Sequence, residues 1–321
     1  MPYLTTAIPG IGGQLKSEPG DFFVEEIPLY LPTGQGQHVY ITIEKTGLST
    51  YTAIKMIAHA LDIPAQAIGH AGLKDAQAVT RQMLSLDGVA PQAVEQLGWP
   101  NLKLLQITPH RNKLKIGHLA GNRFVIRVRG VEPEALPTVQ QVLGVLAEQG
   151  VPNFFGEQRF GNRTNNHILG KLIVQQNAPE FVAEFLGRPQ PTETPPIQAA
   201  RALVDAGRWV EALAQWPGQL ADERRVLAAI VRAEGQLEVA LKVLDKKLKN
   251  FLVSALQGWY FNELLTQRLG RLGHLEDGDV AYLHLNGAAF VVESAAAEQP
   301  RADRFEISPS GPLFGPKLLQ A

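Results

Sequence analysis

Hydrophobic and polar residues alternate along the first half of the chain in the manner of β-strands. Phe22 to Leu29 and His38 to Thr46 have this pattern, and the second segment places Val39, Ile41 and Ile43 on one face. The stretch 32–36 between them is rich in turn residues, which predicts a hairpin. Further strands are predicted at Met83–Leu86, Leu102–Thr108, Lys113–His118 and Arg123–Arg129.

Helical spacing of apolar residues predicts two helices in the same half. The first follows Thr50, which we expect to cap it, and is closed by Asp62 and Pro64. The second is stopped by Gly150 and Pro152, and its apolar positions are Leu136, Val139, Leu143 and Leu146. Strands and helices together predict a mixed α/β (α+β) region.

The pattern changes after residue 187. The segment GRPQPTETPPI is a Pro-rich connector, and from Gln198 to about Leu272 the chain is rich in Ala, Leu, Glu and Arg at helical spacing. Strand-like alternation returns at Val280–Leu285 and Ala288–Glu293. An all-helical unit is therefore expected between α/β segments.

The composition fits a globular protein with two modest domains. The chain has 321 residues, 45% of them hydrophobic and 19% charged. It contains no cysteine, which excludes disulfides, thiolate catalysis and Cys-ligated metals. No signal peptide and no transmembrane run is found, so we expect a soluble, cytoplasmic protein without a membrane partner. Neither a phosphate-binding loop nor a metal-ligand spacing of histidines is present, so we expect no cofactor and no metal.

Positive charge is concentrated in one stretch although the net charge is −1. Residues 96–130 contain no acidic residue and seven cations: Lys103, Arg111, Lys113, Lys115, Arg123, Arg127 and Arg129. A local positive surface of this kind can follow a nucleic-acid backbone. Alternatively, the stretch is a solvated face whose acidic partners come from elsewhere in the fold.

The segment AGLKDAQAVTRQ, residues 71–82, carries a glycine and a Lys–Asp pair just before a predicted strand. Asp75 is therefore expected at the rim of a sheet, where functional residues collect. Lys74 and Arg81 are candidates for keeping its carboxylate ionised and for binding a substrate. The alternative is that the Lys–Asp pair only forms a turn.

A second unusual segment is NFFGEQRFGNRTNN, residues 153–166, which combines aromatic, arginine, amide and glycine residues. Aromatic rings stack on bases and arginine binds phosphate, so Arg159 is a candidate RNA ligand. The alternative is a loop packed by its own aromatic residues.

Four motifs together resemble those of the tRNA pseudouridine synthase D (TruD) family. They are LKSEPGDFFVEE (15–26), GLKD with the following VTRQ, GNRF (121–124) and NFFGEQRFG (153–161). The resemblance is strong over residues 1–176, weaker through the helical middle, and visible again at RFEISPSGPLFG (304–315). The order and separations of the motifs make the match specific.

The resemblance implies a pseudouridine synthase core with a mixed, largely antiparallel sheet. It places this core at residues 1–152 and 301–321, with a helix-rich family-specific insertion domain at 153–300. The implied activity is that of an isomerase that converts uridine-13 in the D-arm of tRNA to pseudouridine. The protein is expected to be a monomer with tRNA as its partner.

The family's catalytic aspartate matches Asp75, and its other site residues match Lys16, Asn122 and Phe124. The carboxylate can act at the ribose C1′, at the uracil C6, or on the C2′ proton, and the sequence does not choose among these. Phe124 is a candidate stacking platform or a plain core residue, and Asn122 a candidate reader of the uracil edge. Lys16 is expected either to contact phosphate or to hold Asp75 charged.

The family's chains continue past the SGPLFG segment, whereas this one ends at Ala321, so we expect a truncated core. One alternative is therefore a non-catalytic RNA-binding protein. Another is a glycoside hydrolase acting on a nucleoside or a sugar, which requires a second functional carboxylate. The candidates near the motifs are Glu25, Glu26 and Glu157.

Overall fold

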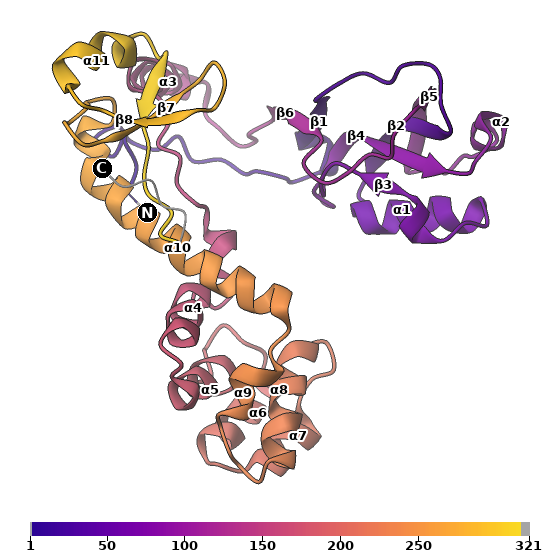
Figure 1. The fold of residues 1–321 in the computed structure, drawn as a ribbon, viewed down its shortest axis with the longest axis vertical. Coiled ribbons are helices and arrows are strands. Elements are labelled where there is room, and N and C mark those ends of the chain that lie inside the picture. The colour runs from indigo at the N-terminus through magenta and orange to yellow at the C-terminus, as the bar shows by residue number, and fades with distance from the viewer. Residues whose placement is uncertain (1, 316–321) are drawn as a thin grey trace. The chain divides into compact units, whose positions relative to one another are not determined.

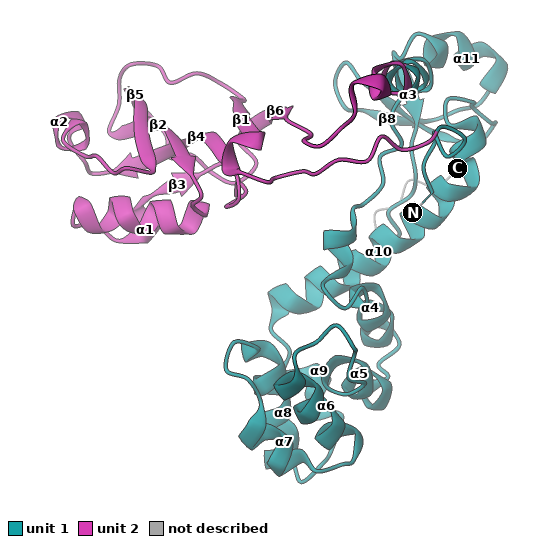
Figure 2. Cartoon of the chain, turned by 180° about the vertical axis from the view of Figure 1, so that it is seen from behind, with its two compact units in different colours: residues 1–8, 141–321 teal, residues 9–140 magenta. Residues whose placement is uncertain are grey.

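The computed structural model describes residues 2–315 of the chain, so the last six residues of the core expected at 301–321 lie outside the described part. The chain divides into two compact units (Figure 2). Pro9–Gln140 form one, here called the sheet unit, and Met1–Ile8 with Gln141–Ala321 form the other, here called the helical unit.

The sheet unit is built on one mixed sheet (Figure 1). Its strands are β1 (Phe22–Pro28), β2 (His38–Thr46), β3 (Gly69–His70), β4 (Val79–Asp87), β5 (Leu102–His110) and β6 (Leu119–Ile126). They lie in the order β5-β2-β4-β1-β6, with β3 paired to β4. Only the β1–β4 pair is parallel among these strands. The mixed, largely antiparallel sheet expected from the sequence is thereby confirmed.

The predicted hairpin between the first two strands is wrong. β4 lies between them, parallel to β1 over Phe23–Glu25 and antiparallel to β2 along all of His38–Thr46. Alternation describes one strand and does not identify its partner, and the connection 29–37 is long enough to pass a neighbouring strand. The strand predicted at Lys113–His118 is also wrong, because that segment is an irregular loop between β5 and β6.

Helix α1 (Thr50–Ala60) covers one face of this sheet. The predicted apolar positions Ile41 and Ile43 are fully buried and pack in one cluster with Ile57. The helix is capped by Ser49, whose Oγ accepts a hydrogen bond from the Thr52 amide at 3.0 Å, and not by Thr50 as expected. The remaining short elements are η1 (Pro19–Asp21), η2 (Ala65–Ala67), α2 (Pro91–Glu95) and η3 (Pro133–Ala135), followed by α3 (Leu136–Gln149), which crosses the boundary between units.

The helical unit confirms the change of pattern seen in the second half of the sequence. Its helices are η4 (Glu157–Phe160), α4 (Asn166–Val174), α5 (Ala178–Leu186), α6 (Pro195–Asp205), α7 (Trp209–Gln215), α8 (Ala221–Arg232), α9 (Val239–Val243), α10 (Lys246–Arg268), η5 (Leu269–Arg271) and α11 (Ala295–Asp303). A small antiparallel sheet has the order β8-β7-β9, with β7 (Val280–Leu283), β8 (Ala289–Val291) and β9 (Ile307–Pro309). Phe181, Leu186 and Leu227 lie at the centre of the helical core.

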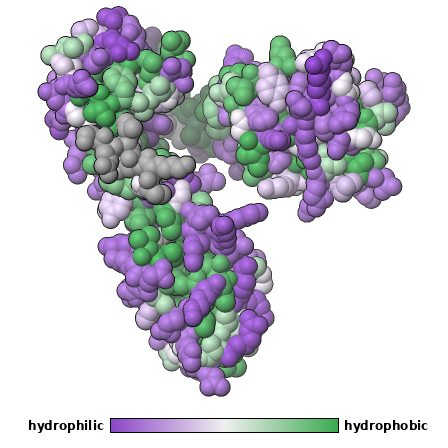
Figure 3. Space-filling view, in the orientation of Figure 1, coloured by the Kyte–Doolittle hydropathy of each residue, from purple (hydrophilic) through white to green (hydrophobic). Residues whose placement is uncertain are grey.

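No helix within residues 2–315 is long and apolar enough to cross a membrane. On the face drawn in Figure 3, hydrophilic residues cover most of the surface of each unit, and hydrophobic residues form smaller patches on it.

Candidate active site

Asp75 lies in the loop 71–78, here called the Asp75 loop, which leads from β3 into β4. The side chains of Ala71 and Ala78 are buried and anchor its two ends. Between them the Lys74 amide donates a hydrogen bond of 2.9 Å to Oγ1 of Thr50. Half of the Asp75 side chain is nevertheless exposed. The loop therefore presents an accessible carboxylate from a fixed backbone.

The buried side chain of Lys45 hydrogen-bonds to the backbone of Asp75. Its Nζ donates hydrogen bonds to the carbonyl oxygens of Asp75 at 2.8 Å and of Leu48 at 2.6 Å. Burial lowers the pKa of the Lys45 ammonium to about 8, although the charge of Asp75 acts in the opposite direction. The sequence analysis did not single out Lys45. The signal was present, because the apolar alternation of β2 places position 45 on the buried face.

Lys16 is the predicted cation that contacts the Asp75 carboxylate. Its Nζ lies 3.1 Å from Oδ1 of Asp75 and 3.9 Å from the ring centre of Phe22. The backbone of Lys16 has a φ of 57° and its carbonyl accepts a hydrogen bond of 3.1 Å from Nε2 of Gln77. The Asp75 loop thus fixes Lys16 through both its side chain and its backbone.

Strand β6 brings Asn122 and Phe124 of the GNRF motif to the same face of the sheet. Phe124 pairs in register with Val24, and Asn122 with Glu26. The Phe124 ring is edge-on to Phe22 with centroids 5.9 Å apart, and 52% of Phe124 is exposed. The alternative that Phe124 is a plain core residue is therefore wrong. A line of contacts runs from Asp75 through Lys16 and Phe22 to Phe124.

Lys74 has Glu26, and not Asp75, as its ion-pair partner among the described residues. Its Nζ pairs with Oε2 of Glu26 at 2.7 Å, and both side chains are almost fully buried. The other oxygen of Glu26 accepts a hydrogen bond of 3.1 Å from the Met83 amide. This buried pair ties the Asp75 loop to β1 and β4.

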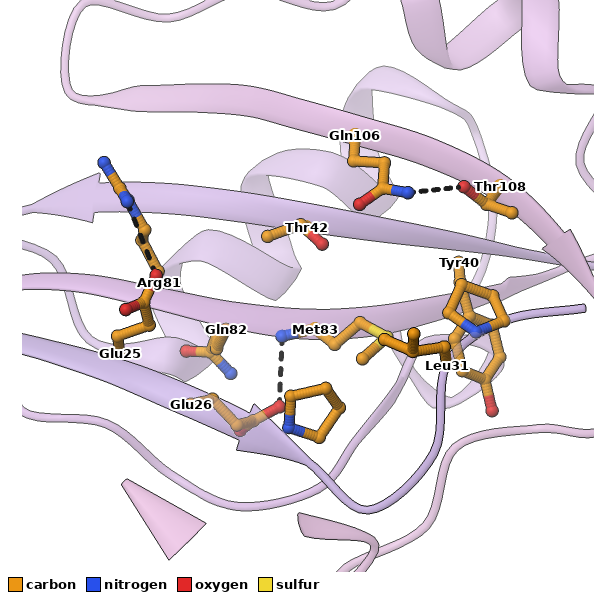
Figure 4. Close-up of a pocket in the computed structure, with 12 residues that line it drawn as sticks. Glu25, Glu26, Leu31, Tyr40, Thr42, Arg81, Gln82, Met83, Gln106 and Thr108 are labelled. Carbon is orange, nitrogen blue, oxygen red and sulfur yellow. Dashed lines mark hydrogen bonds and ion pairs between the residues drawn. The ribbon is translucent and has the colours of Figure 1, made fainter. Parts of the chain in front are cut away.

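Arg81 lies on the opposite face of the sheet. Its Nε is 2.9 Å from Glu44, and its Nη1 is 3.4 Å from Glu25 (Figure 4). Glu25 alternates with Glu26 along β1, so its face is not the face of Asn122 and Phe124. The expectation that Lys74 and Arg81 balance the Asp75 charge directly is not met, because both contact other carboxylates.

The face that carries Arg81 also holds a pocket of about 130 Å³ that is open to solvent (Figure 4). Its walls combine hydroxyl, amide, charged and apolar side chains from four strands, including Tyr40, Thr42, Met83, Gln106 and Thr108. Because Asp75 is associated with the other face, this pocket is separate from the carboxylate.

The basic stretch 96–130 separates into two groups. Four of its cations have acidic partners from other segments: Lys103 with Glu44, Arg123 with Glu25, and Arg127 and Arg129 with Asp21. For these four cations, the alternative is correct: acidic residues from elsewhere in the fold neutralise their charge. The other three cations lie together in the loop 111–118.

Two of the carboxylates considered for a hydrolase have other partners. Glu26 is buried against Lys74, and Glu25 lies on the Arg81 face. The third candidate, Glu157, belongs to η4 of the helical unit. Within residues 2–315 no group of three or more His, Cys, Asp or Glu side chains is arranged to hold a metal ion.

Arg159 also belongs to the helical unit, where it packs among aromatic rings. Its guanidinium carbon lies 5.2 Å from the ring centre of Phe155 and 5.8 Å from that of Phe251. The NFFGEQRFG segment is held by Asn262, whose side chain exchanges two hydrogen bonds of 2.9 Å with the backbone of Phe155. Self-packing, the alternative considered for this segment, therefore accounts for part of its composition.

Comparison with known proteins gives one consistent result. The family model described as tRNA pseudouridine synthase D (TruD) matches residues 1–321. The chain is 44% identical over 319 residues to the tRNA pseudouridine synthase D of Syntrophotalea carbinolica, covering 99% of this chain and 80% of that protein. It is 43% identical to the protein of the same name from Geobacter metallireducens, over 99% of this chain and 78% of that protein.

A solved structure supports the same relationship. The crystal structure from Methanosarcina mazei that carries the name tRNA pseudouridine synthase D superposes with a TM-score of 0.85 at 27% identity. The match covers 98% of this chain and 76% of that chain. Sequence and fold therefore agree on the similarity.

Proposed function

Because the chain belongs to the tRNA pseudouridine synthase D family, we propose that it isomerises a uridine of tRNA to pseudouridine with Asp75 as the catalytic carboxylate. The observation that carries this proposal is the exposed carboxylate of Asp75 on a loop held by Lys45 and paired with Lys16. A nucleophile or base must be both accessible and positioned, and Asp75 is both.

The reaction requires little besides such a carboxylate. The C1′–N1 bond of the uridine breaks, the uracil turns, a C1′–C5 bond forms, the proton on C5 is released, and N1 takes up a proton. Asp75 can contribute by attack at C1′, by attack at C6, or by taking the C2′ proton. In each case Lys16 orients the carboxylate and balances its charge.

Asn122 and Phe124 supply the groups that a displaced uracil needs. A uridine in a helical arm must leave the stack, at a cost of a few kcal/mol, before a carboxylate can reach it. The exposed ring of Phe124 offers a stacking surface, and the exposed amide of Asn122 can hydrogen-bond the uracil edge. We assign Lys74 and Arg81 a supporting role, because both are paired with carboxylates of the sheet.

The target is proposed to be uridine-13 in the D-arm, as the family resemblance implies. We also propose that residues 153–300 are the family's insertion domain and that they grip the tRNA. Hydrogen–deuterium exchange with and without unmodified tRNA tests this second point. Protection within 153–300 is expected, whereas protection confined to the sheet unit would contradict it.

Tritium release from tRNA labelled with [5-³H]uridine tests the activity itself. The wild-type chain is expected to release tritium as water, in an amount of one tritium for each tRNA. Carbodiimide treatment and primer extension then map the product. A stop one nucleotide 3′ to position 13 supports the target, and a stop elsewhere overturns the position while leaving the isomerase intact.

A further inference from the structure

The loop 111–118, here called the basic loop, is fastened to the Asp75 loop. The Gly117 amide donates a hydrogen bond of 2.8 Å to the carbonyl of Ala71, and Gly117 has a φ of 90° that favours glycine. Leu114 is buried in the same cluster as Ala71, and its amide donates a hydrogen bond of 3.0 Å to Oγ of Ser85. The basic loop therefore has a fixed position beside Ala71, at the start of the Asp75 loop.

Three cations of the basic loop have no carboxylate partner among the described residues. Within residues 2–315, no ion pair joins Arg111, Lys113 or Lys115 to a carboxylate. Lys113 donates a hydrogen bond of 2.5 Å to the carbonyl of Gln66, which leaves its charge unneutralised. The other four cations of residues 96–130 all have acidic partners. Positive charge is thus left free at the loop that adjoins the Asp75 loop.

The same two loops expose aliphatic side chains. Ile116 is 80% exposed on the basic loop, and Leu73 is 56% exposed on the Asp75 loop, two residues before the carboxylate. A single exposed aliphatic residue is ordinary on a protein surface. Here two of them lie on anchored loops that are joined by a backbone hydrogen bond and accompanied by free cations.

We propose that the basic loop and Leu73 form one RNA-contact surface beside the catalytic carboxylate. Arg111, Lys113 and Lys115 bind phosphates of the strand that flanks the target uridine, and Leu73 and Ile116 pack against the bases on either side of it. Cations spaced along a loop suit an extended polyanion, and aliphatic wedges support a stack from which one base has been removed. This inference rests on the proposed function and assigns its RNA-binding surface.

Binding of unmodified tRNA at several salt concentrations tests the cations, with Asp75→Asn in every chain to prevent turnover. Changing Arg111, Lys113 and Lys115 together to Gln is expected to weaken affinity at least ~10-fold and to lower the salt slope by about 2. The matched control changes Lys103, Arg123 and Arg127 to Gln, which removes the same charge from paired positions. Its effect is expected to be much smaller. Equal effects of the two triple variants, or no tRNA binding at all, would overturn the proposal.

Tritium release at saturating tRNA tests the aliphatic pair. The double variant Leu73→Ser/Ile116→Ser is expected to lose at least ~10-fold in kcat, while its salt slope stays unchanged. Leu105→Ser is the control, because Leu105 is 46% exposed on β5 and belongs to neither loop. Unchanged release by the double variant would overturn this part. Absence of release by the wild type would instead refute the isomerase, and the salt slopes would still decide the binding surface.

Discussion

Lys16 and Asp75 are separated by 59 positions in the chain, and their side chains meet in an ion pair of 3.1 Å between Nζ and Oδ1. The same ammonium lies 3.9 Å from the ring centre of Phe22, which in turn contacts Phe124. Lys16 therefore links the carboxylate to the aromatic surface on which a uracil is proposed to stack.

Lys16→Gln is expected to lower kcat for tritium release by ~10²-fold, because the carboxylate loses its orienting partner. The affinity for tRNA should change only a few-fold, and Lys16→Arg should recover part of kcat. Arg81→Gln removes the same charge from the opposite face of the sheet and serves as the control. Equal loss of kcat in both variants would show that Lys16 acts only through the general charge of the unit.

Lys45 should make the free energy of unfolding depend on alkaline pH. Folded Lys45 loses its proton near pH 8, whereas unfolded lysine keeps it up to about 10.5, so the unfolded state binds more protons in between. Stability from this group therefore rises as pH increases from 8 to 10. Urea unfolding should find that the wild type gains about 2 kcal/mol over Lys45→Met in this range. A constant difference between the two proteins would mean that Lys45 does not titrate there.

The buried pair of Lys74 and Glu26 should behave as a coupled unit. Lys74→Met leaves an unpaired carboxylate in the interior and is expected to cost about 3–5 kcal/mol. Lys74→Met/Glu26→Gln should be more stable than Lys74→Met, because the amide is neutral and its oxygen can still accept from the Met83 amide. Urea unfolding of both single variants and the double variant measures the coupling. Additive losses would contradict a direct pair.

Phe124→Ala should lower activity more than stability. The ring is half-exposed, so its removal should change the free energy of unfolding by less than about 1.5 kcal/mol. Loss of a stacking partner worth ~1–3 kcal/mol should reduce kcat/KM by about 5- to 150-fold. Phe124→Tyr keeps the ring and should retain most activity. A large loss of thermal stability with little change in kcat/KM would instead make Phe124 a packing residue.

Much of the architecture could be predicted from the sequence because it depends on local periodicity. Alternation along 38–46 correctly identified the buried face of β2, and helical spacing after residue 198 correctly identified the helices from α6 to α10. Strand partners could not be predicted in this way. The β1–β4 pairing is set by the common core and not by either strand alone, so the expected hairpin failed.

The candidate site, like the fold, could be predicted from the sequence only in part. The motif around Asp75 predicted a carboxylate on a connection at the rim of a sheet, and the structure has it in the loop between β3 and β4. The sequence could not predict which way neighbouring cations point. Lys74 pairs with the buried Glu26, and Arg81 lies on the opposite face of the sheet. Lys45, from β2, hydrogen-bonds to the backbone of Asp75. Those directions depend on the register of the strands, which the motifs do not contain.

The most direct test of Asp75 is single-turnover tritium release from [5-³H]uridine-labelled tRNA by the wild type and by Asp75→Asn. The amide has the shape of the carboxylate and lacks its charge, so tRNA binding by Asp75→Asn serves as the control for folding. We predict release by the wild type and a loss of at least ~10³-fold in the variant with affinity within a few-fold. Release by Asp75→Asn at the wild-type rate would contradict the assignment of Asp75 as the catalytic carboxylate.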